Sequence, residues 1–347
     1  GGECELQDLA LGYGRSVSRF SERKRVVKDE NLGPLVATEM TRCIHCTRCV
    51  RFLDEVAGTS ELGAMYRGEH TEIGTLVGTG VHSELSGNII DLCPVGALTS
   101  RPYRYSARAW EMLSHASIAP HDCLGSNIDL HQVRGTVKRV VPRDNESVNE
   151  CWISDRDRFS YEGIYSDQRL ASPQIREHGE WQSVDWQTAI EHAANALRDT
   201  ATRHGVQSLG SLISPSSTLE EMYLAARIMR AMGSDNIDTR LRRGDFRDGV
   251  DPAGFPGLET PVAALETLDA ALIIGGYPRH EQPLINHRLR KAARAGGDVM
   301  AINPRGFDWN IPLGIEQVRS PGAMPAALAA SARGGAGRLQ VDEPTGL

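Results

Sequence analysis

The chain has 347 residues, of which 40% are hydrophobic and 24% are charged, and its formal net charge is −7. The length allows two or three domains, and the composition is ordinary for a globular protein. The acidic charge argues against nonspecific nucleic-acid binding, which needs a basic surface, and no apolar run reaches the roughly 18 residues that a membrane span requires.

Both ends of the sequence resemble cut points. The chain starts at Gly1-Gly2 rather than at a methionine, and it ends in a loop-like stretch over residues 342–347. We therefore expect a fragment of a longer protein, in which the lack of a visible signal peptide carries little weight. Seven cysteines whose spacing suits a metal indicate a reducing compartment.

The first 37 residues contain one isolated cysteine. Cys4 by itself is more typical of a small buried hydrophobic residue than of a ligand. The basic run at residues 23–25 is typical of a solvated surface.

Four cysteines dominate the next stretch of the chain. Cys43, Cys46 and Cys49 follow one another at intervals of three, and Cys93 comes much later with Pro94 directly behind it. A compact triple of thiols with a remote fourth before proline is typical of a cubane iron–sulfur cluster. Proline fixes the exit of the chain, and we expect it to start a helix over residues 94–98.

The motif leaves other uses of these cysteines open. Zinc also takes four ligands, although it usually collects them as two separated pairs. A disulfide framework fits less well, because the number of cysteines is odd and the triple is too closely spaced for internal bridges. The spacing alone also leaves open whether Cys93 serves the same cluster as the triple or a second one.

A helix is expected to leave the triple and to end at Gly58, a typical C-terminal cap. Its apolar line consists of Val50, Leu53 and Val56. Short strands and turns are expected over residues 59–92, which are rich in Gly, Thr and Val.

Three arginines lie close to the triple in sequence, at Arg42, Arg48 and Arg51. Guanidinium groups beside a negatively charged cluster stabilise its reduced form and raise its potential. The alternative is that these side chains point outward into solvent.

Residues 101–170 predict a β-rich domain, with alternating segments such as residues 136–143. Cys123 and Cys151 have no cysteine at C-x2-C spacing beside them, and we interpret them as structural.

From residue 171 onward the pattern predicts alternating strands and helices. Asp185 is expected to cap one helix, and Thr218 with Glu221 forms a capping box for the next. A buried strand is predicted over residues 208–213.

A β–α–β unit is predicted further on, from a strand at residues 268–276, a helix through residues 285–292 and a strand at residues 299–302. Gly275 and Gly276, at the end of the first strand, are more typical of a turn than of a phosphate cradle, because no G-x-G-x-x-G pattern is present. Residues 334–337 are linker-like.

Residues 1–8, 43–52 and 91–100 together resemble the large iron–sulfur subunit of NADH:quinone oxidoreductase, which is the G subunit of bacterial complex I and the 75-kilodalton subunit in mitochondria. The match is specific over the first 100 residues. From about residue 115 to 310 it is looser and resembles the molybdopterin-oxidoreductase domain that this subunit carries as a scaffold.

The resemblance implies an α+β iron–sulfur domain followed by an α/β molybdopterin-oxidoreductase-like domain with a parallel sheet. Residues 1–100 would form the iron–sulfur domain, truncated at its N-terminus. Residues 101–170 would form a β-rich domain that resembles the molybdopterin-oxidoreductase cluster domain with its cluster lost. Residues 171–347 would form the α/β scaffold, truncated at its C-terminus.

By position, the resemblance assigns Cys43, Cys46, Cys49 and Cys93 to one [4Fe–4S] cluster. It makes Cys4 the last ligand of a second [4Fe–4S] cluster, whose histidine and two other cysteines lie just upstream in the family. A [2Fe–2S] cluster is expected only in that upstream part, and no molybdopterin is expected.

One departure from the family pattern concerns a further cubane, which formate dehydrogenase and some complex I subunits carry near the start of the scaffold. At the corresponding ligand positions this chain has Ala119, Asp122, Ser126 and Ser154. None of them supplies a soft thiolate ligand, so we expect no cluster in residues 101–170.

The resemblance implies an electron-relay subunit that passes electrons from NADH towards quinone and has no catalytic residue of its own. The implied partners are the NADH-binding flavin subunit and the quinone-side iron–sulfur subunits of the peripheral arm, with no nucleic acid and no direct membrane insertion. The implied location is the cytoplasmic face of the bacterial plasma membrane, or the matrix face of the mitochondrial inner membrane. The alternatives are a molybdopterin-dependent formate dehydrogenase, the electron-transfer subunit of an NAD-linked hydrogenase, and a structural zinc protein.

Overall fold

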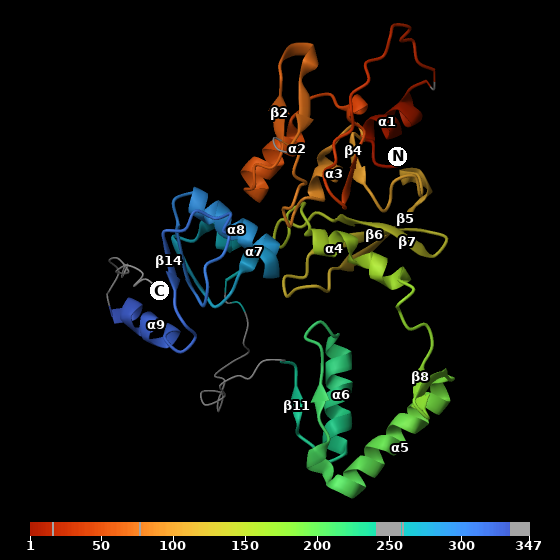
Figure 1. Ribbon diagram of the computed structural model, residues 1–347, viewed down its shortest axis with the longest axis vertical. Helices are drawn as coiled ribbons and strands as arrows, with labels where there is room; N and C mark the ends of the chain where they lie inside the picture. The colour runs from red at the N-terminus through yellow and green to blue at the C-terminus, as the bar shows by residue number, and fades with distance from the viewer. Residues whose placement is uncertain (16, 76–77, 241–257, 259, 334–347) are drawn as a thin grey trace. The chain divides into compact units, whose positions relative to one another are not determined.

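The structure is a computed structural model that describes residues 1–15, 17–75, 78–240, 258 and 260–333 (Figure 1). It divides into two compact units. Unit 1 consists of Gly1–Tyr161 together with Leu258–Leu347, and unit 2 consists of Glu162–Gly257. The linker-like stretch at residues 334–337 lies outside the described residues.

The first hundred residues of unit 1 combine short helices with two small antiparallel sheets. In one sheet β1 (Val36–Thr38) pairs with β4 (Leu98–Ser100), and in the other β2 (Gly63–Met65) pairs with β3 (Glu72–Gly74). The helical segments are α1 (Glu5–Tyr13), η1 (Met40–Arg42), α2 (Arg48–Arg51), η2 (Phe52–Ala57), η3 (Gly68–His70) and α3 (Asn88–Leu92).

The helix expected after the cysteine triple is present and ends as predicted. Its first part is α2, and its continuation η2 is a wider π-helical segment that buries Phe52 and Leu53. Gly58 follows in the left-handed conformation, with φ of 76°, as a glycine cap does. The core of this region holds Leu53 and Ile89, which are both fully buried.

The expectation of a helix that starts at Pro94 is wrong. The helix lies before Cys93, as α3, rather than after Pro94. Gly96 takes a positive φ of 66°, and the chain then enters β4 in register with β1. Pairing of Leu98 with Thr38 therefore replaces the helix that proline could have started.

The β-rich segment that follows is confirmed as an antiparallel sheet of three strands, β5 (Leu113–Ile118), β6 (Asn127–Val133) and β7 (Thr136–Pro142). Ile128, Val140 and Ile153 form its small buried core. The segment also contains η4 (Ala109–Glu111), α4 (Asp155–Phe159), which contacts β7, and η5 (Ser160–Tyr165).

The predicted β–α–β unit forms the other part of unit 1. The parallel strands β12 (Ala270–Ile274), β13 (Asp298–Asn303) and β14 (Ile315–Val318) are neighbours in that order. Leu289 of α8 (Pro283–Arg294) packs on Val299 of β13. The other helical elements are η7 (Val262–Thr267), α7 (Pro278–Glu281) and α9 (Met324–Arg333).

Ion pairs join this β–α–β part to the β-rich segment within unit 1. Glu150 accepts hydrogen bonds from Arg288 at 2.7 Å, from Lys291 at 2.6 Å and from His287 at 3.1 Å, all three on α8. The side chains of Arg288 and His287 are only 3% and 6% exposed. Charges removed from water to this degree need partners, so Glu150 stabilises the packing of α8.

The described residues of unit 2, 162–240, form a β-hairpin, two long helices and a short parallel pair of strands. The hairpin joins β8 (Gln174–Glu177) to β9 (Glu180–Ser183), and β10 (Ser211–Leu212) pairs in parallel with β11 (Ile237–Asp238). The helical segments are α5 (Trp186–His204), η6 (Val206–Ser208) and α6 (Leu219–Ala231).

Both predicted helix caps in unit 2 are confirmed. The carboxylate of Asp185 accepts a hydrogen bond from the Thr188 amide at the start of α5, and Thr218 and Glu221 form a reciprocal capping box on α6. A strand is present within the predicted range 208–213, but it has only two residues, and the prediction that it is buried is wrong because the side chain of Leu212 is 59% exposed. Across the part of the chain that the structure describes, no helix has the length and apolar character needed to cross a membrane.

Candidate metal centre

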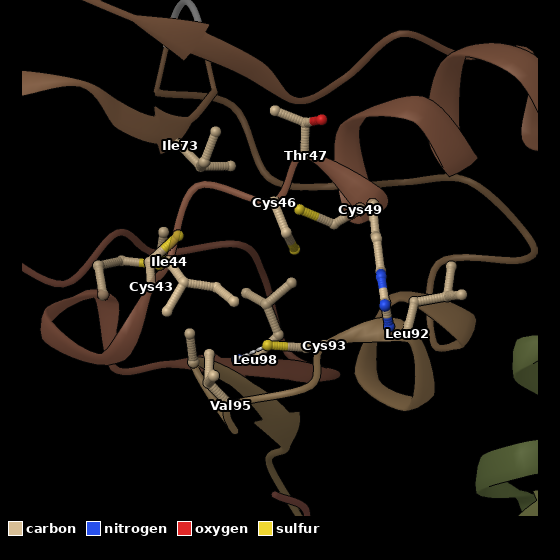
Figure 2. A pocket seen from close by; sticks show the side chains of 13 residues that line it. Cys43, Ile44, Cys46, Thr47, Cys49, Ile73, Leu92, Cys93, Val95 and Leu98 are labelled. Carbon is tan, nitrogen blue, oxygen red and sulfur yellow. Dashed lines mark hydrogen bonds between the residues drawn. The ribbon is translucent and has the colours of Figure 1, made fainter. Parts of the chain in front are cut away.

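Four thiols from two separate stretches of the chain surround one cavity. Cys43 follows η1, Cys46 lies in the next loop, Cys49 belongs to α2, and Cys93 directly follows α3. Figure 2 shows their sulfur atoms facing a common space. This space is about 370 Å³, its opening to solvent included.

The rest of the cavity wall is mainly apolar. Thr47 and Arg48 also line it, and the apolar lining residues are Met40, Ile44, Ile73, Leu92, Val95, Ala97 and Leu98. Such walls lower the local dielectric and restrict the access of water, which are two of the means by which a protein sets the potential of a metal cluster.

The loop that carries the triple has an unusual backbone. His45 and Thr47 both take positive φ angles, of 54° and 58°, in the left-handed region that residues other than glycine seldom adopt. These two residues lie between the three cysteines Cys43, Cys46 and Cys49, which all line the same cavity. The cost of such angles is of order 1–3 kcal/mol each, and it is tolerated most often where function fixes the backbone.

Two backbone amides donate hydrogen bonds to the sulfur atoms. The His45 amide donates to Cys43 Sγ at 3.4 Å, and the Leu98 amide donates to Cys93 Sγ at 3.4 Å. A donor beside a thiolate stabilises its negative charge, and it stabilises a reduced cluster more than an oxidised one. Neither donor was predicted from the sequence, because the direction in which a backbone amide points cannot be inferred from the spacing of residue types.

The surroundings of Cys49 and Cys43 favour the protonated thiol until a cation is bound. Burial raises the pKa of Cys49 to about 12, and the neighbouring Cys93 sulfur acts in the same direction. Burial also raises the pKa of Cys43. Thiolates in this position therefore need the positive charge of a metal, and metal binding would release protons.

The donor set and its spread fit a [4Fe–4S] cluster. Such a cluster has its irons at separate corners, so each of the four thiolates binds a different iron and they do not converge on a single metal ion. The four thiols here are arranged in that way around the cavity. Within residues 1–15, 17–75, 78–240, 258 and 260–333, no three His, Cys, Asp or Glu side chains are gathered so that they could hold a single metal ion.

The three nearby arginines have different positions. Arg48 lines the cavity. Arg42 is held by Glu39 at 2.9 Å, and Arg51 is exposed and is absent from the cavity wall. Arg48 and Arg51 are both exposed, so the solvent-facing interpretation suits both, and only Arg48 of the two also lines the cavity, as the electrostatic interpretation requires.

Cys4 is buried, with 8% of its surface exposed, but it lies outside the cavity wall. Its Sγ accepts a hydrogen bond from the Gln7 amide and so caps α1. The Leu6 amide donates to the Pro94 carbonyl at 3.0 Å, so the segment after Cys4 is attached to the residue that follows Cys93. The segment that carries Cys4 is thus connected, through Pro94, to the segment that carries Cys93.

The remaining cysteines, Cys123 and Cys151, are both exposed. The positions at which the resemblance places a further cubane are filled by Ala119, Asp122, Ser126 and Ser154. Asp122 pairs with Arg156 at 3.0 Å, and Ser154 caps α4. Asp122 and Ser154 are thus occupied in ordinary ion-pair and capping contacts.

Three family models match separate parts of the chain. Residues 33–99 match "NADH-quinone oxidoreductase subunit 3, ferredoxin-like domain", and residues 114–162 match "NADH-ubiquinone oxidoreductase NDSU1/NuoG-like, 4Fe-4S domain". Residues 169–332 match "Molybdopterin oxidoreductase". A ferredoxin-like 4Fe-4S domain is therefore followed by a molybdopterin oxidoreductase domain, as the predicted fold class requires.

Curated relatives resemble most of the chain. The G subunit of NADH-quinone oxidoreductase from Rickettsia conorii is 42% identical over 85% of this chain and 43% of its own length. The NADH-ubiquinone oxidoreductase 75 kDa subunit of Reclinomonas americana is 44% identical over 88% and 45%. The mitochondrial NADH dehydrogenase [ubiquinone] iron-sulfur protein 1 of Solanum tuberosum is 44% identical over 89% and 41%. The chain spans less than half the length of these relatives.

Proposed function

The chain belongs to the family of the NADH-quinone oxidoreductase G subunit and the 75 kDa subunit, and on this premise we propose that it is an electron relay of that complex. The observation that carries the proposal is the convergence of four thiols on one mainly apolar cavity. Electrons derived from NADH would pass through this site towards quinone, and both substrates would react on other subunits.

Cys43, Cys46, Cys49 and Cys93 are the proposed ligands of one [4Fe–4S] cluster. Cys4 is the proposed last ligand of a second [4Fe–4S] cluster, whose other ligands would precede residue 1. A [2Fe–2S] cluster would belong to that preceding part as well. Molybdopterin is not part of the proposal, and the molybdopterin oxidoreductase domain acts as a scaffold.

A cluster at the four-thiol cavity would supply one-electron redox chemistry. The residues of the chain hold it, exclude water and set its charge environment. The four thiolates provide the covalent ligation, while the His45 and Leu98 amides donate to the sulfurs of Cys43 and Cys93. Arg48 adds a positive charge at the cavity wall. None of these roles requires a general base or a nucleophile, so we assign no catalytic residue.

The proposed partners are the other subunits of the peripheral arm, namely the NADH-binding flavin subunit and the quinone-side iron–sulfur subunits. The proposed location is the cytoplasmic face of the bacterial membrane, or the matrix face in a mitochondrion. The proposal assigns the chain no contact with nucleic acid and no insertion into the bilayer.

Metal analysis of the anaerobically purified chain tests the proposal. We expect a brown protein with about four irons per chain, because only one complete set of thiolates is present. Visible absorbance and elemental analysis measure this directly. A colourless protein that contains zinc would overturn the relay, and stoichiometric molybdenum would favour a molybdopterin enzyme such as formate dehydrogenase instead.

Replacing Arg48 with glutamine is expected to lower the midpoint potential of the cluster. Reduction adds negative charge, and a guanidinium at the cavity wall favours that state. The charge is partly screened by solvent, so its contribution is about 1 kcal/mol, or roughly 40 mV for one electron. Redox titration followed by EPR measures the shift. Arg51→Gln is the matched control, because Arg51 is exposed like Arg48 but does not line the cavity. An equal shift in both variants would contradict a specific role for Arg48.

A further inference from the structure

The position of the fourth thiol of the cavity, Cys93, depends on a helix that is too short to be stable by itself. Cys93 directly follows α3, which has only five residues. Isolated helices of this length are unstable in water, because nucleation costs more than a few hydrogen bonds return. Contacts from elsewhere in the chain must therefore fix α3, and with it the position of Cys93.

Ile89 packs in the core beside Leu53, and further hydrogen bonds come from Ile153, Asp155 and Arg158, far away in sequence. The Asp155 carboxylate accepts a hydrogen bond from the Ser86 hydroxyl at 2.5 Å and another from the Gly87 amide at 2.6 Å. Burial raises the pKa of Asp155 to about 6, which leaves it ionised and accepting both bonds at neutral pH. Asp155 thus holds the turn that leads into α3.

The first residue of α3 is held by the backbone of Ile153. The fully buried Asn88 side chain donates to the Ile153 carbonyl at 2.8 Å and accepts from the Ile153 amide at 3.1 Å. This pair satisfies both ends of a buried amide, and such fully satisfied networks fix one geometry.

The far end of α3 is held by Arg158. Its side chain is only 4% exposed and forms a two-pronged ion pair with Asp91, two residues before Cys93. Arg158 also donates to Asn88 Oδ1 at 3.4 Å, which connects both ends of the helix. A planar guanidinium that meets both carboxylate oxygens fixes direction as well as distance.

All of these hydrogen bonds come from the segment that matches a 4Fe-4S domain model, residues 114–162. At the ligand positions that the resemblance assigns to a further cubane, this segment has Ala119, Asp122, Ser126 and Ser154 in place of cysteine. The segment does supply hydrogen bonds to α3 and to the turn before it.

We propose that Ile153, Asp155 and Arg158, here called the α3 brace, position the Cys93 thiolate for cluster binding. The inference rests on the proposed function, in that Cys93 is taken as a cluster ligand. Asp155 and Arg158 are positioning residues, since they act on the cluster through α3 rather than by touching it. The segment 114–162 would then affect electron transfer by positioning Cys93 through α3.

The test compares three variants of the full chain, purified anaerobically. Arg158→Lys keeps the charge but loses the two-pronged contact with Asp91, and Ser86→Ala removes one bond to Asp155 with little change in volume. Arg156→Lys is the control, because Arg156 lies on the same helix but pairs with Asp122. We measure the EPR line shape of the reduced cluster and the rate of iron release to a chelator.

We expect Arg158→Lys to change the EPR line shape and to speed iron release about 10–100-fold, as loss of a ligand-orienting contact does. Ser86→Ala should change both in the same direction by less, and Arg156→Lys should match the wild type. Altered thermal unfolding with an unchanged line shape and release rate would overturn the brace and leave the relay intact. If Arg158→Lys fails to fold, Ser86→Ala decides by the same two measurements. A wild-type chain without iron would overturn the relay itself, and the brace with it.

Discussion

Replacing Cys46 with alanine is expected to abolish the EPR signal of one [4Fe–4S] cluster and to stop NADH-to-quinone electron transfer in the assembled complex. Cys46 lies in the loop between Cys43 and Cys49, and its sulfur faces the same space as theirs. The methyl group of alanine cannot coordinate iron, so one corner of the cluster would lose its protein ligand. EPR of the reduced protein and NADH-driven quinone reduction measure the two losses.

The matched control is Cys151→Ala. Cys151 is exposed and lies outside the cavity wall, so its removal should leave both the signal and the rate unchanged. Iron analysis of the same samples separates loss of the cluster from loss of assembly. If the signal and the rate both survive in Cys46→Ala, the ligand assignment is wrong.

Replacing Glu150 with glutamine is expected to destabilise unit 1 by about 2–4 kcal/mol. Glu150 accepts from His287, Arg288 and Lys291, and the Arg288 side chain is only 3% exposed. The neutral amide leaves part of this positive charge uncompensated in a site that water barely reaches. Arg288 keeps a second partner in Glu266, so the loss of unfolding free energy should be smaller than for a buried charge with no partner.

Urea unfolding monitored by fluorescence measures this loss as a lower midpoint. Glu55→Gln is the control, because Glu55 is exposed in the same unit. A midpoint in Glu150→Gln that equals the wild-type value would mean that the ion pairs contribute no net stability.

The same ion pairs predict how the stability depends on pH. The hydrogen bond from His287 lowers the pKa of Glu150 well below its usual range, and Lys291 and Arg288 add to this against the opposing effect of burial. Since the folded pKa lies below the unfolded value of about 4.3, the unfolded state binds more protons as the pH falls. The stabilisation is therefore present above about pH 4.3 and is lost progressively below it. Glu150→Gln should lack this part of the acid sensitivity, so the two unfolding midpoints should converge on acidification.

Features that rest on local spacing could be predicted from the order of the residues. Residue types at fixed intervals report directly on hydrogen bonds within one turn, so the caps at Asp185 and Thr218 and the glycine stop at Gly58 were predictable. Apolar periodicity likewise placed β12, α8 and β13 in a parallel unit. The cysteine spacing selected the four thiols that line the cavity, because no other arrangement in the chain offers a compact triple with a remote partner.

Features that depend on contacts between distant residues could not be predicted in this way. Pro94 could have started a helix, but pairing of β4 with β1 drew residues 98–100 into a strand. Leu212 belongs to an apolar run, yet nothing in unit 2 covers it among the described residues. The helix α3 was not predicted, since five residues are too few to show a helical periodicity. Its conformation depends in part on contacts with distant residues such as Asp155 and Arg158. Contacts between residues some 65 apart in sequence are set by packing, and packing energies are a property of the whole fold.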